Sequence, residues 1–246
     1  MKINILNLPL ILSKEEIYPF LNLGPAPGSL PANIDKLIDT HLRSITHLAK
    51  PQGLIRVCSI RRITPDRVIL DDASLVIEGP RTTAHFVNCE KITLLAATLG
   101  RGIDERLAEL QQTAGAADAF IYNGIASAAV EHTTEILDAI SVRDIRRSSY
   151  YPTARFSPGY GDWSLEHQQQ FIDSISGEKA GLAVTSHHLL QPVKSVTAVI
   201  GWSKVPLERS YDQPRGKPCQ GTLTCRDCSL GENCLSKHRD NHYSIP

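Results

Sequence analysis

An Ala-rich stretch from about Ala117 to Ile140 constrains the fold more than any other feature of this 246-residue chain. Alanine has the highest helix propensity of all residues, so the stretch predicts one long helix, preceded by a break at Gly115. Small residues are concentrated at 126–129, where they would let another backbone approach closely.

Shorter helices are predicted on both sides of it. Ser13 and Glu16 are three residues apart, which is the spacing of a capping box and marks the start of a short helix. Apolar residues recur at spacings of mostly three and four through residues 34–48, as in an amphipathic helix. Further helices are expected at 102–112 and after Ser164, which would act as an N-cap.

Short segments rich in Val, Ile and Leu predict strands. The turn at Asp71-Asp72 suggests a hairpin, and Pro192 divides two later strands. The predicted strands are 54–60, 67–70, 74–78, 91–98, 181–190 and 193–201. This order of elements predicts an α+β fold with an antiparallel or mixed sheet and flanking helices. A Rossmann fold is not favoured, because no Gly-x-Gly-x-x-Gly follows a strand into a helix.

Composition narrows the class of partner. Hydrophobic residues make up 41% of the chain and charged residues 21%, as in a globular protein with a real core. The formal net charge is zero, so a nucleic-acid partner is not expected. No apolar run approaches the ~18 residues of a membrane helix, and the N-terminus does not read as a signal peptide. A cytoplasmic protein that does not enter membranes is expected.

The segment Arg155–Gly161 reads Arg-Phe-Ser-Pro-Gly-Tyr-Gly and has the chemistry of a ligand site. An arginine can hold a carboxylate with two parallel hydrogen bonds, and a Pro-Gly corner lets backbone groups approach a ligand. Tyr160 could cover an adenine or face a sulfonium cation. The carboxylate of Glu131 could take an amine. On residue types alone, an arginine beside a turn is also typical of an ordinary surface loop.

This segment resembles the S-adenosylmethionine-binding Arg-x-x-x-Gly-Tyr signature of the activation (reactivation) domain of cobalamin-dependent methionine synthase. The similarity extends to Thr98-Leu99-Gly100, to the helical segment Ile125–Glu131 and to Pro192–Thr197, where Pro-x-x-Ser-x-Thr stands for the family's Pro-x-x-Ser-x-Ser. It covers roughly residues 10–203. The order and spacing of these pieces make the resemblance fairly specific.

The resemblance implies an α+β domain with a twisted antiparallel sheet that binds S-adenosylmethionine in a shallow groove. By position, Arg155 would hold the ligand's carboxylate and Glu131 its amine. Ser157 and Gly159 would offer backbone contacts, and Tyr160 would line the groove near the adenine or the corrinoid. The implied partners are a corrinoid (cobalamin-binding) protein such as methionine synthase, which would carry the cobalamin, and an electron donor.

The chain departs from the family in two respects. It contains no methyltetrahydrofolate, homocysteine or cobalamin module, and it diverges from the family after Trp202. We therefore expect an activation domain-like unit at 1–205 and a small Cys-rich C-terminal appendage at 206–246.

The appendage holds four cysteines with the spacing Cys-x5-Cys-x2-Cys-x5-Cys. Four thiolates can surround one zinc ion or an iron–sulfur cluster, although the spacing matches neither a zinc ribbon nor a ferredoxin. We favour an iron–sulfur cluster, because a reactivation module needs an electron; a metal-free tail or disulfides are the alternatives. The four are Cys219, Cys225, Cys228 and Cys234. Cys58 and Cys89 lie apart from them and are expected in the core.

Three functional hypotheses follow. The first is an S-adenosylmethionine-binding protein that supports reductive methylation of a corrinoid on a separate methyltransferase. The second is an interaction module for a corrinoid protein that has lost cofactor chemistry. The third is a small iron–sulfur redox protein whose working part is the tail.

Overall fold

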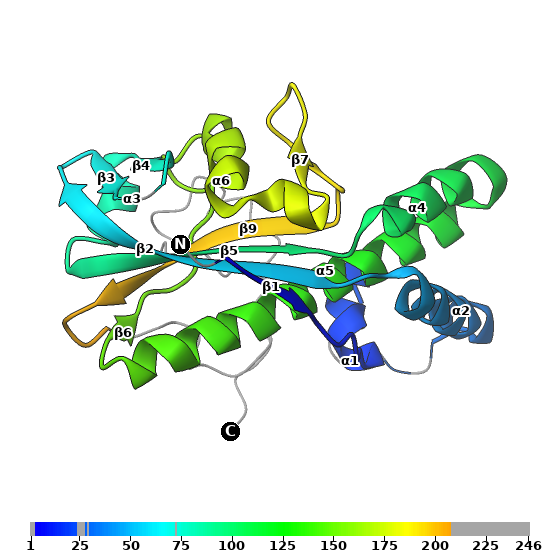
Figure 1. Cartoon of the computed structure of the whole chain (residues 1–246). Coiled ribbons are helices and arrows are strands. Elements are labelled where there is room, and N and C mark those ends of the chain that lie inside the picture. Colours follow the sequence, from blue (N-terminus) through cyan, green and yellow to red (C-terminus); the bar gives the residue numbers. More distant parts are fainter. Residues whose placement is uncertain (1–2, 24–27, 29, 72, 208–246) are drawn as a thin grey trace.

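The fold is built on the strand β5 (Cys89–Thr98), which pairs antiparallel with β2 (Gln52–Ile63) on one side and β9 (Ser195–Ser203) on the other. The computed structural model describes residues 3–23, 28, 30–71 and 73–207. Within them, seven strands form one twisted antiparallel sheet in the order β4-β3-β2-β5-β9-β6, with β1 beside β2 (Figure 1). The other four strands are β1 (Asn4–Asn7), β3 (Arg67–Leu70), β4 (Val76–Glu78) and β6 (Tyr151–Pro152).

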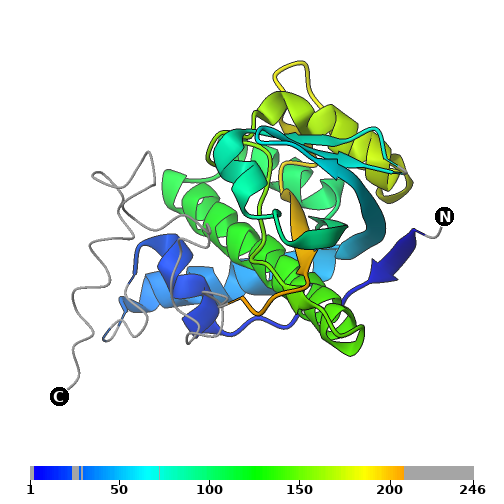
Figure 2. The ribbon, with the colours of Figure 1, turned by 90° about the vertical axis from the view of Figure 1, so that its left-hand side faces the viewer.

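Helices cover both faces of this sheet. The long helix α5 (Ala116–Arg147) lies along one face, and α6 (Gln168–Ile175) lies over the other (Figures 1 and 2). Four N-terminal and central helices pack around the first half of α5. These are α1 (Lys14–Ile17), the 3-10 helix η1 (Tyr18–Leu21), α2 (Ala32–Leu48) and α4 (Arg101–Thr113). The remaining short elements are α3 (Pro80–Ala84), η2 (Leu165–His167), η3 (Gly177–Ala180), β7 (Ala183–Val184) and β8 (Leu190–Gln191).

Side chains of β5 alternate between two hydrophobic clusters because successive residues of a strand point to opposite faces. Leu94 and Ala96 pack in the cluster that contains the apolar face of α6. Leu95 and Ala97 pack on the other face, with Ile145 and Leu137 of α5 respectively. Since both faces are covered, this strand reads as a nearly continuous apolar run in the sequence.

The backbone of α5 approaches its neighbours closely, as the small residues predicted. A Cβ added at Gly124 would lie 2.5 Å from Leu21 Cδ2 and 3.0 Å from the Phe20 carbonyl oxygen of η1. A Cβ at Gly53 of β2 would overlap Leu137. The helix extends to Arg147, seven residues beyond the predicted end. The glycines, and not only the alanines at 126–129, set these close packing distances.

Most predicted elements are confirmed. The capping box is present: Ser13 Oγ accepts from the Glu16 backbone N–H, and the Glu16 carboxylate accepts from the Ser13 N–H. The α+β class, the antiparallel sheet and the hairpin β3–β4 are as expected. Ser164 caps η2, which leads directly into α6.

The strand predicted at 181–190 is wrong. Only two short pieces, β7 and β8, are extended, and they pair with each other as a hairpin. Thr185 turns the chain between them, because its hydroxyl accepts from the backbone N–H groups of His187 and Leu189, and His188 has a positive φ of 61°. The strand β1 and the helix α3 were not predicted.

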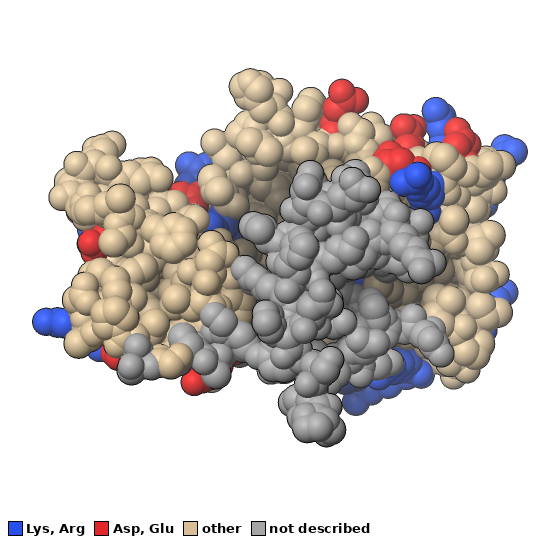
Figure 3. Space-filling model, turned by 180° about the vertical axis from the view of Figure 1, so that it is seen from behind, with Lys and Arg blue, Asp and Glu red and all other residues tan. Residues whose placement is uncertain are grey.

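The surface is mixed in charge. Lys and Arg lie beside Asp and Glu around the described part of the face shown in Figure 3. This distribution agrees with the zero net charge. Among the described helices, none is both long and apolar enough to reach across a membrane.

Candidate functional site

The segment that carries the Arg-x-x-x-Gly-Tyr motif lies along the edge of β9. The strand β6 pairs with the end of β9, and Thr153 donates its backbone N–H to the Gly201 carbonyl at 2.9 Å. Phe156 and Val199 then exchange two backbone hydrogen bonds, of 3.0 and 2.7 Å. The backbone before and within the start of the motif is thus fixed by the sheet.

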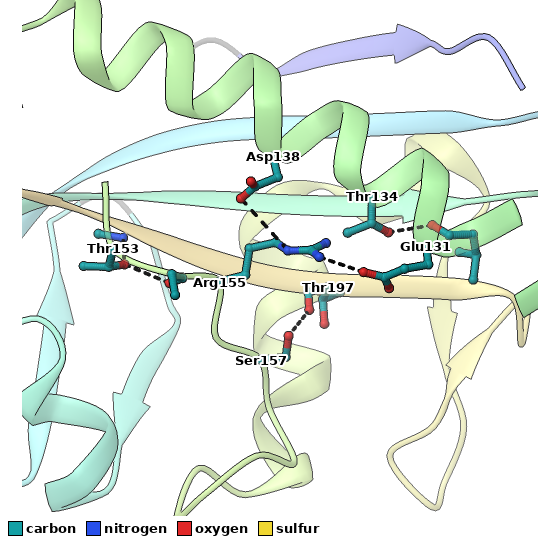
Figure 4. Close-up of polar contacts among 10 residues, drawn as sticks. Glu131, Thr134, Asp138, Thr153, Arg155, Ser157 and Thr197 are labelled. Atoms are coloured by element: carbon teal, nitrogen blue, oxygen red, sulfur yellow. Dashed lines mark hydrogen bonds and ion pairs between the residues drawn. The ribbon is translucent and has the colours of Figure 1, made fainter. Parts of the chain in front are cut away.

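This extended backbone sends Arg155 and Phe156 to opposite sides. Phe156 is buried in the cluster on the α6 side, where its ring stacks with that of Trp163 at 6.3 Å between centroids. Arg155 points instead toward α5 (Figure 4). The aromatic anchor therefore sets the direction of the neighbouring guanidinium group.

Arg155 meets two carboxylates of α5. Its Nη2 donates to Glu131 Oε1 at 2.7 Å, and its Nε lies 4.0 Å from Asp138 Oδ1 (Figure 4). The Arg155 side chain is 7% exposed, whereas that of Glu131 is 32% exposed. The structure thus brings together two residues that the sequence assigned to one ligand, and it adds Asp138, which the sequence did not identify.

Ser157 links the motif to the sheet through its side chain. Its Oγ donates to the Thr197 carbonyl at 2.6 Å, and the Thr197 hydroxyl accepts from Gln168 Nε2 at 2.7 Å. This chain of contacts joins the motif, β9 and the start of α6. The Ser157 hydroxyl thus has a structural partner, and the backbone contact expected of Ser157 stays a prediction.

Gly159 and Tyr160 form the tight turn of the motif. Gly159 has a φ of +91° and donates its N–H to the Trp163 carbonyl at 2.7 Å, while Tyr160 donates to the Ser157 carbonyl. A Cβ at Gly159 would also lie 2.8 Å from Leu165 Cδ2, so only glycine fits without strain. Tyr160 is 58% exposed, and its role at a ligand stays a prediction.

The sequence reasoning did not identify Asp162, which fixes the far end of the motif. Its carboxylate accepts from the backbone N–H groups of Arg81 and Thr82, at 2.7 and 2.9 Å, and from the Thr82 hydroxyl at 2.6 Å. Partial burial alone would raise the pKa of Asp162, but these hydrogen bonds outweigh it and lower the pKa. The only sequence signal is an aspartate beside a turn, with nothing to point to α3.

The four tail cysteines, Cys219, Cys225, Cys228 and Cys234, lie outside the described residues, so their metal-binding role stays a prediction. Within the described ranges, no group of three or more His, Cys, Asp or Glu side chains could hold a metal ion. Cys58 and Cys89 are buried, as predicted for core residues. Burial raises the pKa of Cys89 to about 12, which makes it an inert thiol.

Comparisons with known proteins place the fold. No family model matches the chain, and no curated protein matches it. Among solved structures, the chain is similar to the MetH reactivation domain bound to AdoHcy, with a TM-score of 0.61 and 13% sequence identity. The match covers 83% of this chain and 79% of that one. The chain therefore has the fold of the MetH reactivation domain, as its sequence led us to expect.

Proposed function

We propose that this protein binds S-adenosylmethionine between the 155–160 segment and α5, and supports reductive methylation of a corrinoid on a separate cobalamin-dependent methyltransferase such as methionine synthase. The observation that carries the proposal is the Arg155–Glu131 pair, which lies at the motif in a fold shared with a domain described as bound to AdoHcy. S-adenosylmethionine and AdoHcy have the same amino-acid end, so one site would take both.

The amino-acid end of this ligand is a zwitterion, and the site offers the complementary charges. The Arg155 guanidinium would hold the α-carboxylate with two N–H groups. The half-buried Glu131 carboxylate would accept from the α-ammonium group. Because Arg155 is already desolvated in the free protein, a ligand that pairs both charges adds little further desolvation cost.

The remaining motif residues would present the sulfonium to the partner. The turn at Gly159 holds the exposed Tyr160 at the rim, where its ring can cover the ligand or contact a corrinoid. The methyl group would move from the ligand's sulfur to the partner's corrinoid and leave AdoHcy, and this reductive transfer requires one electron from an electron donor. The described residues of this chain would bind and orient S-adenosylmethionine, the methyl donor. They need supply no acid or base.

The four tail cysteines extend the proposal on sequence grounds alone. Cys219, Cys225, Cys228 and Cys234 would hold an iron–sulfur cluster or a zinc ion. A cluster would give the protein an electron carrier of its own. A zinc ion would make the tail a structural clasp, and the electron would come from another protein.

Calorimetric titration with AdoHcy tests the binding site. The wild type should bind AdoHcy, and Arg155→Ala should lose at least about 100-fold in affinity, since a buried charge-assisted pair is removed. Arg143→Ala is the control, because Arg143 is an exposed arginine of α5 that contacts Asp144. Equal affinities in wild type and Arg155→Ala, with both folded by circular dichroism, would contradict the assignment.

A second titration separates the proposal from an interaction module without cofactor chemistry. The protein should bind a cobalamin-loaded methionine synthase fragment that lacks its own reactivation domain, and AdoHcy should change that affinity. Binding to the fragment that is indifferent to AdoHcy would favour the interaction module.

A further inference from the structure

Lys194 lies in the segment before β9 and is held there by its own backbone and that of its neighbours. Its carbonyl accepts from the Leu99 N–H at 3.1 Å, and the Val193 N–H donates to Asp104 Oδ2 at 2.6 Å. Lys194 is 8% exposed. Its ammonium group reaches α5, where Nζ lies 2.7 Å from Asn123 Oδ1 and 2.8 Å from Ser127 Oγ.

Both of these partners are neutral. Within the described part of the chain, no carboxylate lies within ion-pair distance of Lys194 Nζ, and no third acceptor contacts it. Burial lowers the pKa of Lys194, while the charge of Asp104 acts in the opposite direction. An ammonium group has three N–H donors, so one remains for an acceptor from outside the described residues. Burying a charge without an opposite charge beside it is costly, and an acceptor on a bound ligand would reduce this cost.

The two partners of Lys194 lie on the same face of α5 as Glu131 of the proposed amino-acid site. Asn123, Ser127 and Glu131 are spaced by four residues, which places them in one row along α5. At 1.5 Å per residue, Ser127 is about 6 Å and Asn123 about 12 Å from Glu131 along the helix axis. Asn123 is exposed and Ser127 half-buried, so the row leads outward from Arg155.

In the other direction along α5, the space is filled by packing. Ile145 of α5 is buried against Ala198 and Ile200 of β9, and Trp202 and Tyr150 close this cluster. A ligand held by Arg155 and Glu131 would therefore extend away from this cluster, toward Ser127 and Lys194. The ribose C3′ of S-adenosylmethionine is about seven bonds from its carboxyl carbon, an extended span of roughly 8 Å at an advance of about 1.2 Å per bond. This span ends between Ser127 and Asn123.

We propose that Lys194, held by Asn123 and Ser127, binds the adenosine half of the ligand by donating a hydrogen bond to its ribose hydroxyl groups. This inference rests on the proposed function and assigns a specificity residue to it. A cation on this row would favour an S-adenosyl ligand over an amino acid that carries only a simple alkyl group on sulfur. The sequence patterns did not single out Lys194.

The test uses two probes on the full chain. AdoHcy carries both halves of the ligand, whereas 5′-methylthioadenosine carries only the adenosine half. Lys194→Met should weaken both probes by about tenfold, the usual effect of one hydrogen bond to a charged donor. Glu131→Gln is the matched control, since it should weaken AdoHcy and leave 5′-methylthioadenosine unchanged. Lys194→Arg keeps the donors and should recover most of the affinity.

A change on the ligand makes the test independent of any folding defect in the variant. AdoHcy without its two ribose hydroxyl groups should bind the wild type about tenfold more weakly than AdoHcy does, and Lys194→Met should bind the two equally. If the wild type binds AdoHcy and Lys194→Met keeps the full preference for the hydroxyl groups, this inference is overturned and the proposed function stands. If the wild type binds neither AdoHcy nor 5′-methylthioadenosine, both are overturned.

Discussion

Arg155 Nη2 and Glu131 Oε1 lie 2.7 Å apart, one group on the segment beside β9 and the other on the helix that covers the sheet. They are 24 residues apart in sequence and meet because α5 and the motif segment are both held against the same strand. The pair joins two elements in the free protein. A zwitterionic ligand would replace one protein ion pair by two ion pairs to itself.

Glu131→Gln tests this exchange from the side of the amine. The amide keeps the size of the carboxylate but loses its charge, so AdoHcy should bind about tenfold more weakly, as expected for one charge-assisted hydrogen bond. A deaminated AdoHcy analogue should bind wild type and variant alike, because it has no ammonium group to pair. Calorimetry with both ligands measures the difference. An equal loss for both ligands would mean that Glu131 acts only by orienting Arg155.

Asp162→Asn should make the free energy of unfolding depend less on pH in the acidic range. The lowered pKa of Asp162, relative to its ordinary value of 3.8, means that its carboxylate stabilises the fold above pH 3.8 and that this contribution is lost as pH falls through the folded-state pKa. The variant should therefore be less stable than the wild type at pH 7 by about 1 kcal/mol, a modest figure because the residue is exposed. Urea unfolding from pH 7 to pH 3 should show the two free energies converging. Asp173→Asn, on the exposed side of α6, controls for the loss of a surface carboxylate.

Gly124→Ala should destabilise the contact between α5 and η1. The added methyl group would meet Leu21 and the Phe20 carbonyl at 2.5 and 3.0 Å, and overpacking of this kind costs about 1–3 kcal/mol. Gly102→Ala in α4 is the control, since its nearest neighbour would be the Leu48 carbonyl oxygen at an ordinary 3.6 Å. The control should be neutral or slightly stabilising, because alanine favours helix. Thermal unfolding followed by circular dichroism compares the two; equal melting temperatures would show that η1 moves away at little cost.

Anaerobic purification with metal analysis tests the tail. A brown protein with about four irons per chain would identify an iron–sulfur cluster, and a colourless protein with about one zinc would identify a zinc site. Replacing all four tail cysteines by serine should remove the metal and leave AdoHcy binding unchanged, since the proposed ligand residues lie at 131–194. A metal-free wild type purified under the same conditions would favour the metal-free tail or disulfides.

Much of the fold follows from local sequence signals. The capping box at Ser13, the apolar row of α2 and the Ala-rich run of α5 act within one or two helical turns, so residue spacing was sufficient. The β7–β8 hairpin was missed because the turn depends on side-chain hydrogen bonds from a single threonine, Thr185, inside a run of strand-forming residues. The short strand β1 has mostly exposed residues and carries no alternating pattern.

The sequence likewise identified some features of the candidate site and not others. Its motif residues could be named because the resemblance placed them in order, but their contact geometry depends on pairing between distant segments. Asp162 meets Thr82 across 80 residues, and Lys194 meets Ser127 across 67. Neither contact can be predicted from residue spacing, because its two residues belong to different elements that are distant in the sequence. Only the sheet register, which places Phe156 beside Val199, determines which side chains face α5.

The length of α5 has a consequence for local unfolding of the protein. Its 32 residues form a rod of about 48 Å, whose first half lies in the cluster with α1 and α2 and whose second half lies in the clusters against the sheet. Glu131 is near the midpoint, where these clusters adjoin. Neither half can be exposed to solvent without fraying a helix that the other half holds in place. Slowly exchanging amides should therefore extend through the whole middle of α5, and a ligand bound there would slow the exchange of both halves together.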